Sequence, residues 1–207
     1  MSVNASSRTQ LKTNLLQQIQ QLDQQEALRP SSHPEIDQLI YQLEGLNPIS
    51  QPLHETHRPT LLGTWQLVYA SRGTVVTRRI EENLPLPVEI RRLWQRLTAS
   101  PQDNTPIAAE NGVVLTLPLM GEITAIAQGS WQPYEEAESA NVSFSAFSLQ
   151  PTRFLGVNGF NLPKLTLSVL DFFRREALWI TPYLDDDLRL GRGATGNLFV
   201  FRRETLL

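Results

Sequence analysis

Cysteine is absent from the 207 residues of this chain. Its absence excludes a disulfide scaffold, a thiolate nucleophile, a cysteine-rich metal site and a cofactor tethered through sulfur. The sequence also has no run of about 18 consecutive apolar residues, the length that a membrane-spanning helix needs. Any contact with lipid is therefore expected to be peripheral or to use an internal cavity.

Histidine is scarce, because only His33, His54 and His57 occur. None follows Arg58, so the rest of the chain has no histidine for a Ser-His-Asp arrangement or a histidine metal site. His54 and His57 have the i, i+3 spacing that a metal site can use, but two such side chains in a proline-rich linker are typically solvated. We therefore expect no catalytic residue, no metal site and no cofactor.

Neither sign of charge dominates, since 18 basic and 21 acidic side chains give a formal net charge of -3. A balanced charge gives no reason to expect nucleic acid as a partner. The N-terminus lacks the basic and apolar regions of a secretory signal, and it also differs from an organelle transit peptide. We expect a cytoplasmic protein.

The first 58 residues predict two amphipathic helices followed by a linker. Apolar side chains recur there every three or four positions, which is the periodicity of a helix. Pro30 ends the first stripe, and Pro34 stands at the start of the second. Each helix is short, so we expect both to pack on another surface. The two stripes are Leu11, Leu15, Ile19 and Leu22, then Ile36, Leu39, Ile40 and Leu43.

From residue 59 onward the period changes to two, which is typical of strands. Eight or nine short strands at regular spacing indicate a sandwich or a barrel. We therefore divide the chain into a helical extension and linker, 1–58, and a β domain, 59–207. A glycine-rich stretch, 191–196, does not open a helix and is interpreted as a hairpin turn. The expected strands are 61–70, 75–80, 113–117, 123–128, 141–146, 165–169, 177–181 and 197–202.

Residues 88–97 interrupt the β pattern and predict a short basic amphipathic helix. Its apolar side chains share one side of a helical wheel, and its arginines share the other. The helix would close one end of the barrel as a lid, or lie on an anionic membrane with Trp94 at the interface. The residues assigned to this lid or membrane contact are Arg91, Arg92, Trp94 and Arg96.

Two segments resemble the plastid lipid-associated protein/fibrillin (PAP/fibrillin) family. Residues 61–69 (LLGTWQLVY) resemble the family's opening strand, and residues 183–193 (YLDDDLRLGRG), continued by 196–200 (GNLFV), resemble its C-terminal signature. Gly191 is a departure, because the family usually has a serine-like residue there. Plant members carry a transit peptide that this sequence lacks, which suggests a cyanobacterial-type member or a processed form.

The resemblance implies a mainly β protein with a lipocalin-like antiparallel β-barrel. It also implies non-catalytic binding or storage of a hydrophobic lipid, carotenoid or prenylquinone at thylakoid membranes or plastoglobule-type lipid bodies. The location would be cytoplasmic and peripheral to the thylakoid membrane, or chloroplast for a processed plant protein. The alternative is a protein-interaction scaffold with a filled barrel, in which the N-terminal helices dock a partner from prenylquinone synthesis or photosynthesis.

The family motif also implies structural roles for named residues. In lipocalins a Gly-x-Trp element places the Trp at the closed end of the barrel, so Trp65 is expected to plug that end with Arg202 or Arg203 stacked on it. Asp185, Asp187, Arg189 and Arg192 are expected to form a buried carboxylate–guanidinium network. The full motif set is Gly63, Trp65, Asp185, Asp187, Arg189, Arg192, Gly193, Gly196 and Phe199.

An eight-stranded barrel is just wide enough to be filled by side chains or to hold one small ligand. Both outcomes stay open at this point. If the barrel is hollow, polar side chains would orient the ligand head group and apolar ones would line the wall. The expected polar contacts are Tyr69, Thr181 and Tyr183, and the expected wall residues are Phe144, Leu167, Val169 and Trp179.

Overall fold

The computed structural model describes residues 2–74, 77, 88–100, 107–118, 121–134, 138–154, 157–158, 165–168 and 177–204. Four helices come first in the described chain: α1 (Ser2–Gln21), α2 (Gln24–Leu28), α3 (Pro34–Glu44) and α4 (Arg58–Leu61). Asp23 caps α2 by accepting a hydrogen bond from the Gln25 amide, and proline stands in the first turn of α3. Both predicted helices are confirmed as α1 and α3. No helix among the described residues is both long and apolar enough to cross a membrane.

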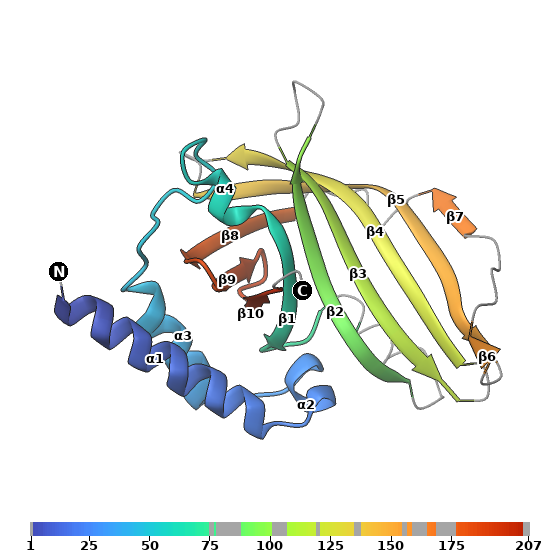
Figure 1. Ribbon diagram of the computed structural model, residues 1–207, viewed down its shortest axis with the longest axis horizontal. Coiled ribbons are helices and arrows are strands. Elements are labelled where there is room, and N and C mark those ends of the chain that lie inside the picture. Colours follow the sequence, from blue (N-terminus) through green and yellow to red (C-terminus); the bar gives the residue numbers. More distant parts are fainter. Residues whose placement is uncertain are drawn as a thin grey trace.

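Ten strands follow in the described part of the chain, and eight of them form a closed antiparallel ring. The ring order is β1-β2-β3-β4-β5-β8-β9-β10, and it closes because β10 pairs with β1. The two short strands β6 and β7 pair with β5 outside the ring (Figure 1). The strands are β1 (Gly63–Ala70), β2 (Glu89–Ala99), β3 (Ile107–Leu117), β4 (Gly121–Tyr134), β5 (Ser139–Phe154), β6 (Val157–Asn158), β7 (Leu165–Ser168), β8 (Ala177–Leu184), β9 (Leu188–Gly193) and β10 (Leu198–Arg203). The predicted mainly β barrel with N-terminal helices is confirmed.

Two apolar clusters lie on opposite sides of this ring. The interior cluster includes Leu67, Leu97, Trp131 and Phe201. The exterior cluster lies where α1 and α3 cross the outside of the strands at the left of Figure 1. It contains Leu15, Ile19, Ile36, Ile40, Leu43, Tyr69, Tyr183, Leu188, Leu190, Leu198 and Val200. The helices therefore cover apolar side chains that the strands turn outward.

The predicted helix at 88–97 is wrong, because these residues form the strand β2. Ile90, Leu93 and Leu97 are all buried, and their spacing of three and four residues resembles a helix. The spacing of three has another cause, which is a β-bulge between Ile90 and Arg92 in the pairing with β3. A bulge adds one residue to one strand, so the inward positions shift by one.

The other expected strands differ mainly in length. The hairpin of β3 and β4 is much longer than the ranges 113–117 and 123–128 predicted, and it continues into the 16 residues of β5. The predicted strand 75–80 lies outside the described residues except for Thr77. Residues 191–193 belong to β9, and the turn that follows them at 194–197 leads into β10, as the hairpin interpretation predicted.

We predict that the helices belong to the same cooperative unit as the strands. Ile40 of α3 is fully buried in the exterior cluster. Ile40→Ala should lower the free energy of unfolding by about 2–5 kcal/mol, since a cavity replaces packed methyl groups. The exposed neighbour Gln42 offers a control, and Gln42→Ala should change the value by less than about 0.5 kcal/mol. Urea denaturation measures both, and equal values for the two variants would contradict the prediction.

Candidate functional site

The interior of the ring contains a cavity of about 530 Å³. Its wall is almost entirely apolar and comes from strands on all sides of the ring. The described residues that line it include Leu67, Leu93, Val113, Leu115, Ala125, Ala127, Trp131, Val142, Phe144, Phe147, Leu149, Trp179, Phe199 and Phe201, and its polar residues include Gln95, Asn111 and Asn197. A space of this volume and lining is typical of a site for a small apolar molecule.

Aromatic rings form one side of this cavity. The ring centroid of Trp179 lies 5.9 Å from that of Trp131 and 5.1 Å from that of Phe199. Trp179 occupies the space in front of Gly191, where an added Cβ would come within 2.1 Å of the indole Cζ2. The glycine that departs from the family pattern is therefore required by the position of Trp179.

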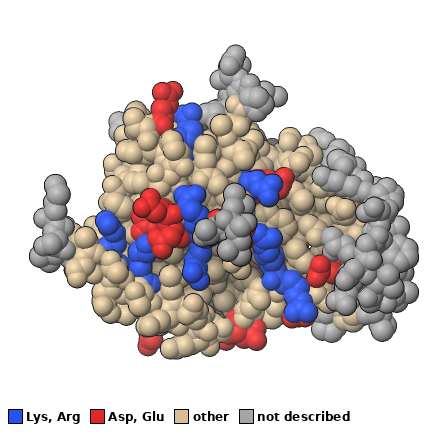
Figure 2. Space-filling view, in the orientation of Figure 1, with Lys and Arg blue, Asp and Glu red and all other residues tan. Residues whose placement is uncertain are grey.

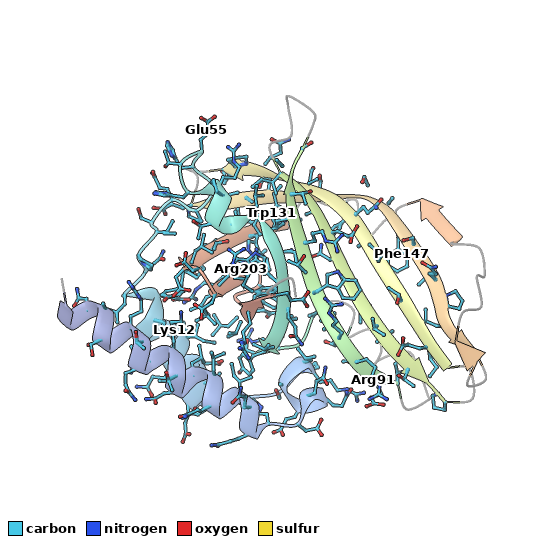
Figure 3. All side chains as sticks on the ribbon, in the orientation of Figure 1. Lys12, Glu55, Arg91, Trp131, Phe147 and Arg203 are labelled. Carbon is cyan, nitrogen blue, oxygen red and sulfur yellow. The ribbon has the colours of Figure 1, made fainter. Side chains whose placement is uncertain are left out.

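Trp65 and Arg203 close one end of the ring. Trp65 is fully buried and donates from its indole N–H to the carbonyl of Leu61. The guanidinium of Arg203 lies 4.1 Å from the Trp65 ring centroid and donates to the carbonyls of Thr60, Leu62 and Asp186. The stacked arginine expected on Trp65 is thus Arg203, one of the two candidates. Figure 3 shows Arg203 and Trp131 toward this end and Phe147 far along β5.

Gly63 allows Arg203 to reach this position. A Cβ at Gly63 would lie 2.6 Å from Nη1 of Arg203, and the backbone φ of 129° is one that other residues rarely adopt. The Gly-x-Trp element therefore provides both the buried indole and the space for the guanidinium beside it.

Arg189 is the largest departure from the expected motif, because it points into the ring and is fully buried. Its guanidinium lies 4.4 Å from the ring centroid of Phe201, 5.1 Å from that of Trp65 and 5.6 Å from that of Trp131. Burial and the positive charge of Arg203 lower the pKa of Arg189 to about 9. Among the described residues no carboxylate lies within ion-pair distance of it.

A hydrogen-bonded chain of side chains leads from Arg189 to the cavity wall. Nη2 of Arg189 donates to Oε1 of Gln95 at 2.6 Å, and Nε2 of Gln95 donates to Oδ1 of Asn111 at 2.7 Å. Gln95 and Asn111 both line the cavity. The mainly apolar wall of the cavity therefore has a polar spot at Gln95 and Asn111, and hydrogen bonds connect that spot to a buried cation.

The expected network among Asp185, Asp187, Arg189 and Arg192 is wrong. The two carboxylates instead accept from Lys12 of α1, at 2.7 Å for Asp185. Arg192 lies on the outer side of β9 and pairs with Glu44 of α3 at 2.5 Å. The alternation of β9 separates these partners, because Arg189 faces inward while Leu188 and Leu190 pack under the helices. The motif charges thus fasten the helices to the barrel.

Asp185 is the centre of the contact with α1. Burial raises the pKa of its carboxyl, but hydrogen bonds from Lys12, Tyr183 and the Leu188 amide outweigh burial and lower this pKa to about 2. Burial also raises the pKa of the Tyr183 hydroxyl, which donates to Asp185 at 2.5 Å. The carboxylate of Asp185 therefore stays ionised in moderate acid and keeps its ion pair with Lys12.

Phe144 and Trp179 line the cavity, as expected for the ligand wall, but Tyr69 and Tyr183 do not. Both tyrosines face outward into the exterior cluster, where the Tyr69 hydroxyl donates to Asp37. The reason is a β-bulge in each strand, between Leu67 and Tyr69 and between Ile180 and Tyr183. Each bulge reverses the alternation after it.

The structure does not place the three other predicted ligand contacts in the cavity wall. Thr181 is buried, its hydroxyl has no partner within the described structure, and it is not among the cavity-lining residues. Leu167 belongs to β7, but its side chain lies outside the described part, and Val169 lies wholly outside it. Of the remaining motif residues, Phe199 and Gly193 line the cavity. Gly196 has a φ of 77° in the turn before β10.

The basic residues assigned to a lid or membrane contact form an exposed line along β2, visible as blue side chains near the middle of Figure 2. Each is paired with a carboxylate: Arg91 with Glu89, Arg92 with Glu204 and Arg96 with Glu110. Trp94 lies over Gly112 of β3, and the guanidinium of Arg92 lies 4.8 Å from its ring centroid. The lid interpretation is wrong, because β2 is a strand in the wall of the ring. Contact of these residues with a membrane stays a prediction.

Sequence reasoning missed Gln95, Asn111, Trp131 and Phe201 as residues of the site. Gln95 stood on the polar side of the predicted helix, so its burial was not expected. Asn111 lies in a stretch that was not assigned to a strand. The missing signal was the register of β2 against β3, which places Gln95 opposite Asn111.

In the described part of the chain, no group of three or more His, Asp and Glu side chains could hold a metal ion. His54 and His57 instead bond locally, since Nδ1 of His54 is 2.9 Å from the Thr56 hydroxyl and Nδ1 of His57 is 3.0 Å from the Gln51 carbonyl.

A family model described as PAP_fibrillin matches residues 9–202, which is nearly the whole chain. The match begins in α1 and ends in β10, so it includes the helices, the ring and the cavity. No curated protein and no solved structure matches the chain.

We predict that Gly63→Ala lowers the free energy of unfolding by roughly 1–3 kcal/mol, because it combines an unfavourable φ with displacement of Arg203. Gly45 is the control, since its φ is -65° and an added Cβ would meet only an atom 3.5 Å away. Gly45→Ala should change stability by less than about 0.5 kcal/mol. Thermal or urea unfolding gives both values, and a Gly63→Ala variant as stable as the parent would refute this account of the closed end.

We also predict a pH-dependent contribution from Asp185. A carboxyl whose pKa falls on folding stabilises the fold above its unfolded pKa of about 3.9, and it loses this contribution as the pH falls through the folded value. Asp185→Asn should therefore destabilise the protein near pH 6, and the difference from the parent should shrink between pH 4 and 2. Urea titrations across this range measure it, with the exposed Asp186→Asn as control. A difference independent of pH would contradict the assignment.

Proposed function

The chain belongs to the PAP/fibrillin family, and on that basis we propose that it binds or stores a hydrophobic lipid, carotenoid or prenylquinone without altering it chemically. The family consists generally of plastid lipid-associated proteins that are structural and non-catalytic. The observation that carries the proposal is the apolar cavity of about 530 Å³ inside the ring.

The cavity wall supports an apolar occupant. Its aromatic and aliphatic side chains come from seven strands, so a bound molecule would be surrounded rather than laid on a surface. Burial of apolar surface is favourable by about 25 cal/mol per Å² and needs no specific geometry. A wall of this kind would therefore accept several related isoprenoid or acyl chains, with specificity left to the polar spot at Gln95 and Asn111.

The side chains at the cavity support binding without catalysis. General acid–base chemistry needs a group that exchanges a proton near neutral pH and touches the substrate. The described lining holds amides, a few hydroxyls and an apolar wall, and the chain has no histidine beyond His57. Arg189 is an ionisable side chain close to the described lining, but it is buried behind the wall residues.

Family membership is also the support for the proposed location, which is peripheral to thylakoid membranes or lipid bodies. This would be the cytoplasmic side in a cyanobacterium or the chloroplast in a plant. Contact with the membrane would be transient and would serve to load or release the ligand.

The alternative is a scaffold whose N-terminal helices dock a protein partner while the barrel is filled. The cavity weighs against a filled barrel. The helices offer the half-exposed Tyr41 of α3 for such a partner, although one face of its ring contacts the guanidinium of Arg192. Substitution of Tyr41 would test the scaffold more cleanly than removal of the helices, because their removal would expose the exterior cluster.

Native mass spectrometry of the protein purified from its source tests the proposal. We expect a co-purifying apolar molecule, and saturable binding of a prenylquinone, a carotenoid or a fatty acid by the delipidated protein. The absence of both would overturn the proposed function.

A matched pair of variants assigns this binding to the cavity. Ala127→Trp places an indole in the lining of the cavity and should reduce affinity at least about tenfold by occupying the ligand's space. Gln128 is the next residue on β4 and is exposed on the opposite face. Gln128→Trp adds the same side chain outside and should leave affinity unchanged. Equal loss in both variants would place the binding site elsewhere.

A further inference from the structure

Arg189 carries a charge that nothing in the described structure balances. It is fully buried, and its Nε and Nη1 atoms have no hydrogen-bond partner among the described residues. The like charge of Arg203 contacts the same indole of Trp65 and repels that of Arg189. Contact with three aromatic rings offsets part of the free-energy cost of burying this charge. A buried cation is nevertheless normally retained only with an anionic partner.

The hydrogen bonds from Arg189 fix which atoms donate and which accept as far as the cavity wall. A guanidinium can only donate, so Gln95 must accept through Oε1 and turn its amide N–H₂ toward Asn111. Asn111 then accepts through Oδ1, which leaves its own Nδ2 as the terminal donor of the chain. Asn111 is partly exposed and lines the cavity. The wall thus presents a donor whose orientation is set by a buried cation.

Other polar atoms at the cavity are also mostly hydrogen-bond donors. The indole N–H groups of Trp131 and Trp179 are buried in the aromatic wall and have no acceptor in the described structure. They make two unmatched donors in the cavity wall. One unmatched acceptor, Oδ1 of Asn197, stands against them among the lining residues. A ligand that brings acceptors would correct this imbalance, and a carboxylate brings about four acceptor sites and no donor.

We propose that the cavity selects an amphipathic molecule with one apolar chain and one carboxylate, of the fatty-acid class, and seats the carboxylate against Asn111. This inference rests on the proposed function and specifies the chemistry of its ligand. The apolar chain lies along the wall of β3, β4 and β5, where Leu115, Phe147 and Leu149 line the cavity. Arg189 acts as a positioning residue, because it reaches the carboxylate through Gln95 and not by direct contact.

The test compares cis-parinaric acid with its methyl ester, which share one fluorescent chain and differ in the head-group charge. Fluorescence titration of the delipidated full-length protein at neutral pH should show the acid bound at least about tenfold more tightly than the ester, as expected for a charge-assisted hydrogen bond in a low-dielectric site. Asn111→Leu keeps a similar side-chain volume but removes the donor. It should reduce this ratio to near one and leave the affinity for the ester within about twofold.

Arg192→Met provides the control for charge. Arg192 lies on the outer side of the same strand and pairs with Glu44, so its loss changes the net charge by the same amount as loss of Arg189. The ratio of acid to ester affinity should stay unchanged in Arg192→Met and fall in Arg189→Met. If Arg189→Met does not fold, Gln95→Leu interrupts the same chain and should give the same fall.

The outcomes separate this inference from the function it rests on. Equal affinity of the parent protein for acid and ester would overturn the carboxylate class and leave the proposed function standing. Binding of neither molecule, with no other apolar ligand bound, would overturn both. A preference for the acid that persists in Asn111→Leu would overturn the seat at Asn111.

Discussion

The contact of one indole with two guanidinium groups organises this fold. Trp65 on the first strand of the ring lies within about 5 Å of Arg189 on β9 and Arg203 on β10. Arg203 also donates to carbonyls in the segment that enters β1, and Arg189 donates to Gln95 on β2. These contacts join the first and last strands where the ring closes. Two like charges tolerate this proximity because aromatic faces and oriented carbonyls surround them.

The same region explains why the helices are part of the barrel. Successive residues of β9 face opposite sides of the ring. Arg189 and two glycines face inward, and Leu188, Leu190 and Arg192 face outward. A strand that is apolar or charged on both faces needs cover on both sides. The helices supply the outer cover through the exterior cluster and through the ion pairs of Lys12 and Glu44. The division of the chain at residue 58 stays a prediction, but the packing joins the two parts closely.

The sequence predicted the architecture well and the facing of individual side chains poorly, and the errors share one cause. Periodicity identified α1, α3 and most strands, because alternation survives over five or six residues. Bulges in β1, β2 and β8 each shift that alternation by one residue. They turned Tyr69 and Tyr183 outward and gave β2 the spacing of a helix. A bulge depends on the register with a neighbouring strand, so no single segment encodes it visibly. The pairing of Gln95 with Asn111 was hidden for the same reason.

The alternatives of a filled or a hollow barrel both describe part of this molecule. At the closed end large side chains fill the interior, with Trp65, Trp131 and Arg189 all fully buried. Farther from the closed end, the inward-facing residues of β4 include the small Ala125 and Ala127, and the cavity lies there. Eight strands leave just enough width for this choice, so the size of inward side chains decides it locally. The filled end holds the cation and the hollow end holds the apolar space, and their boundary is the place where a ligand with one polar end and one apolar end would fit both.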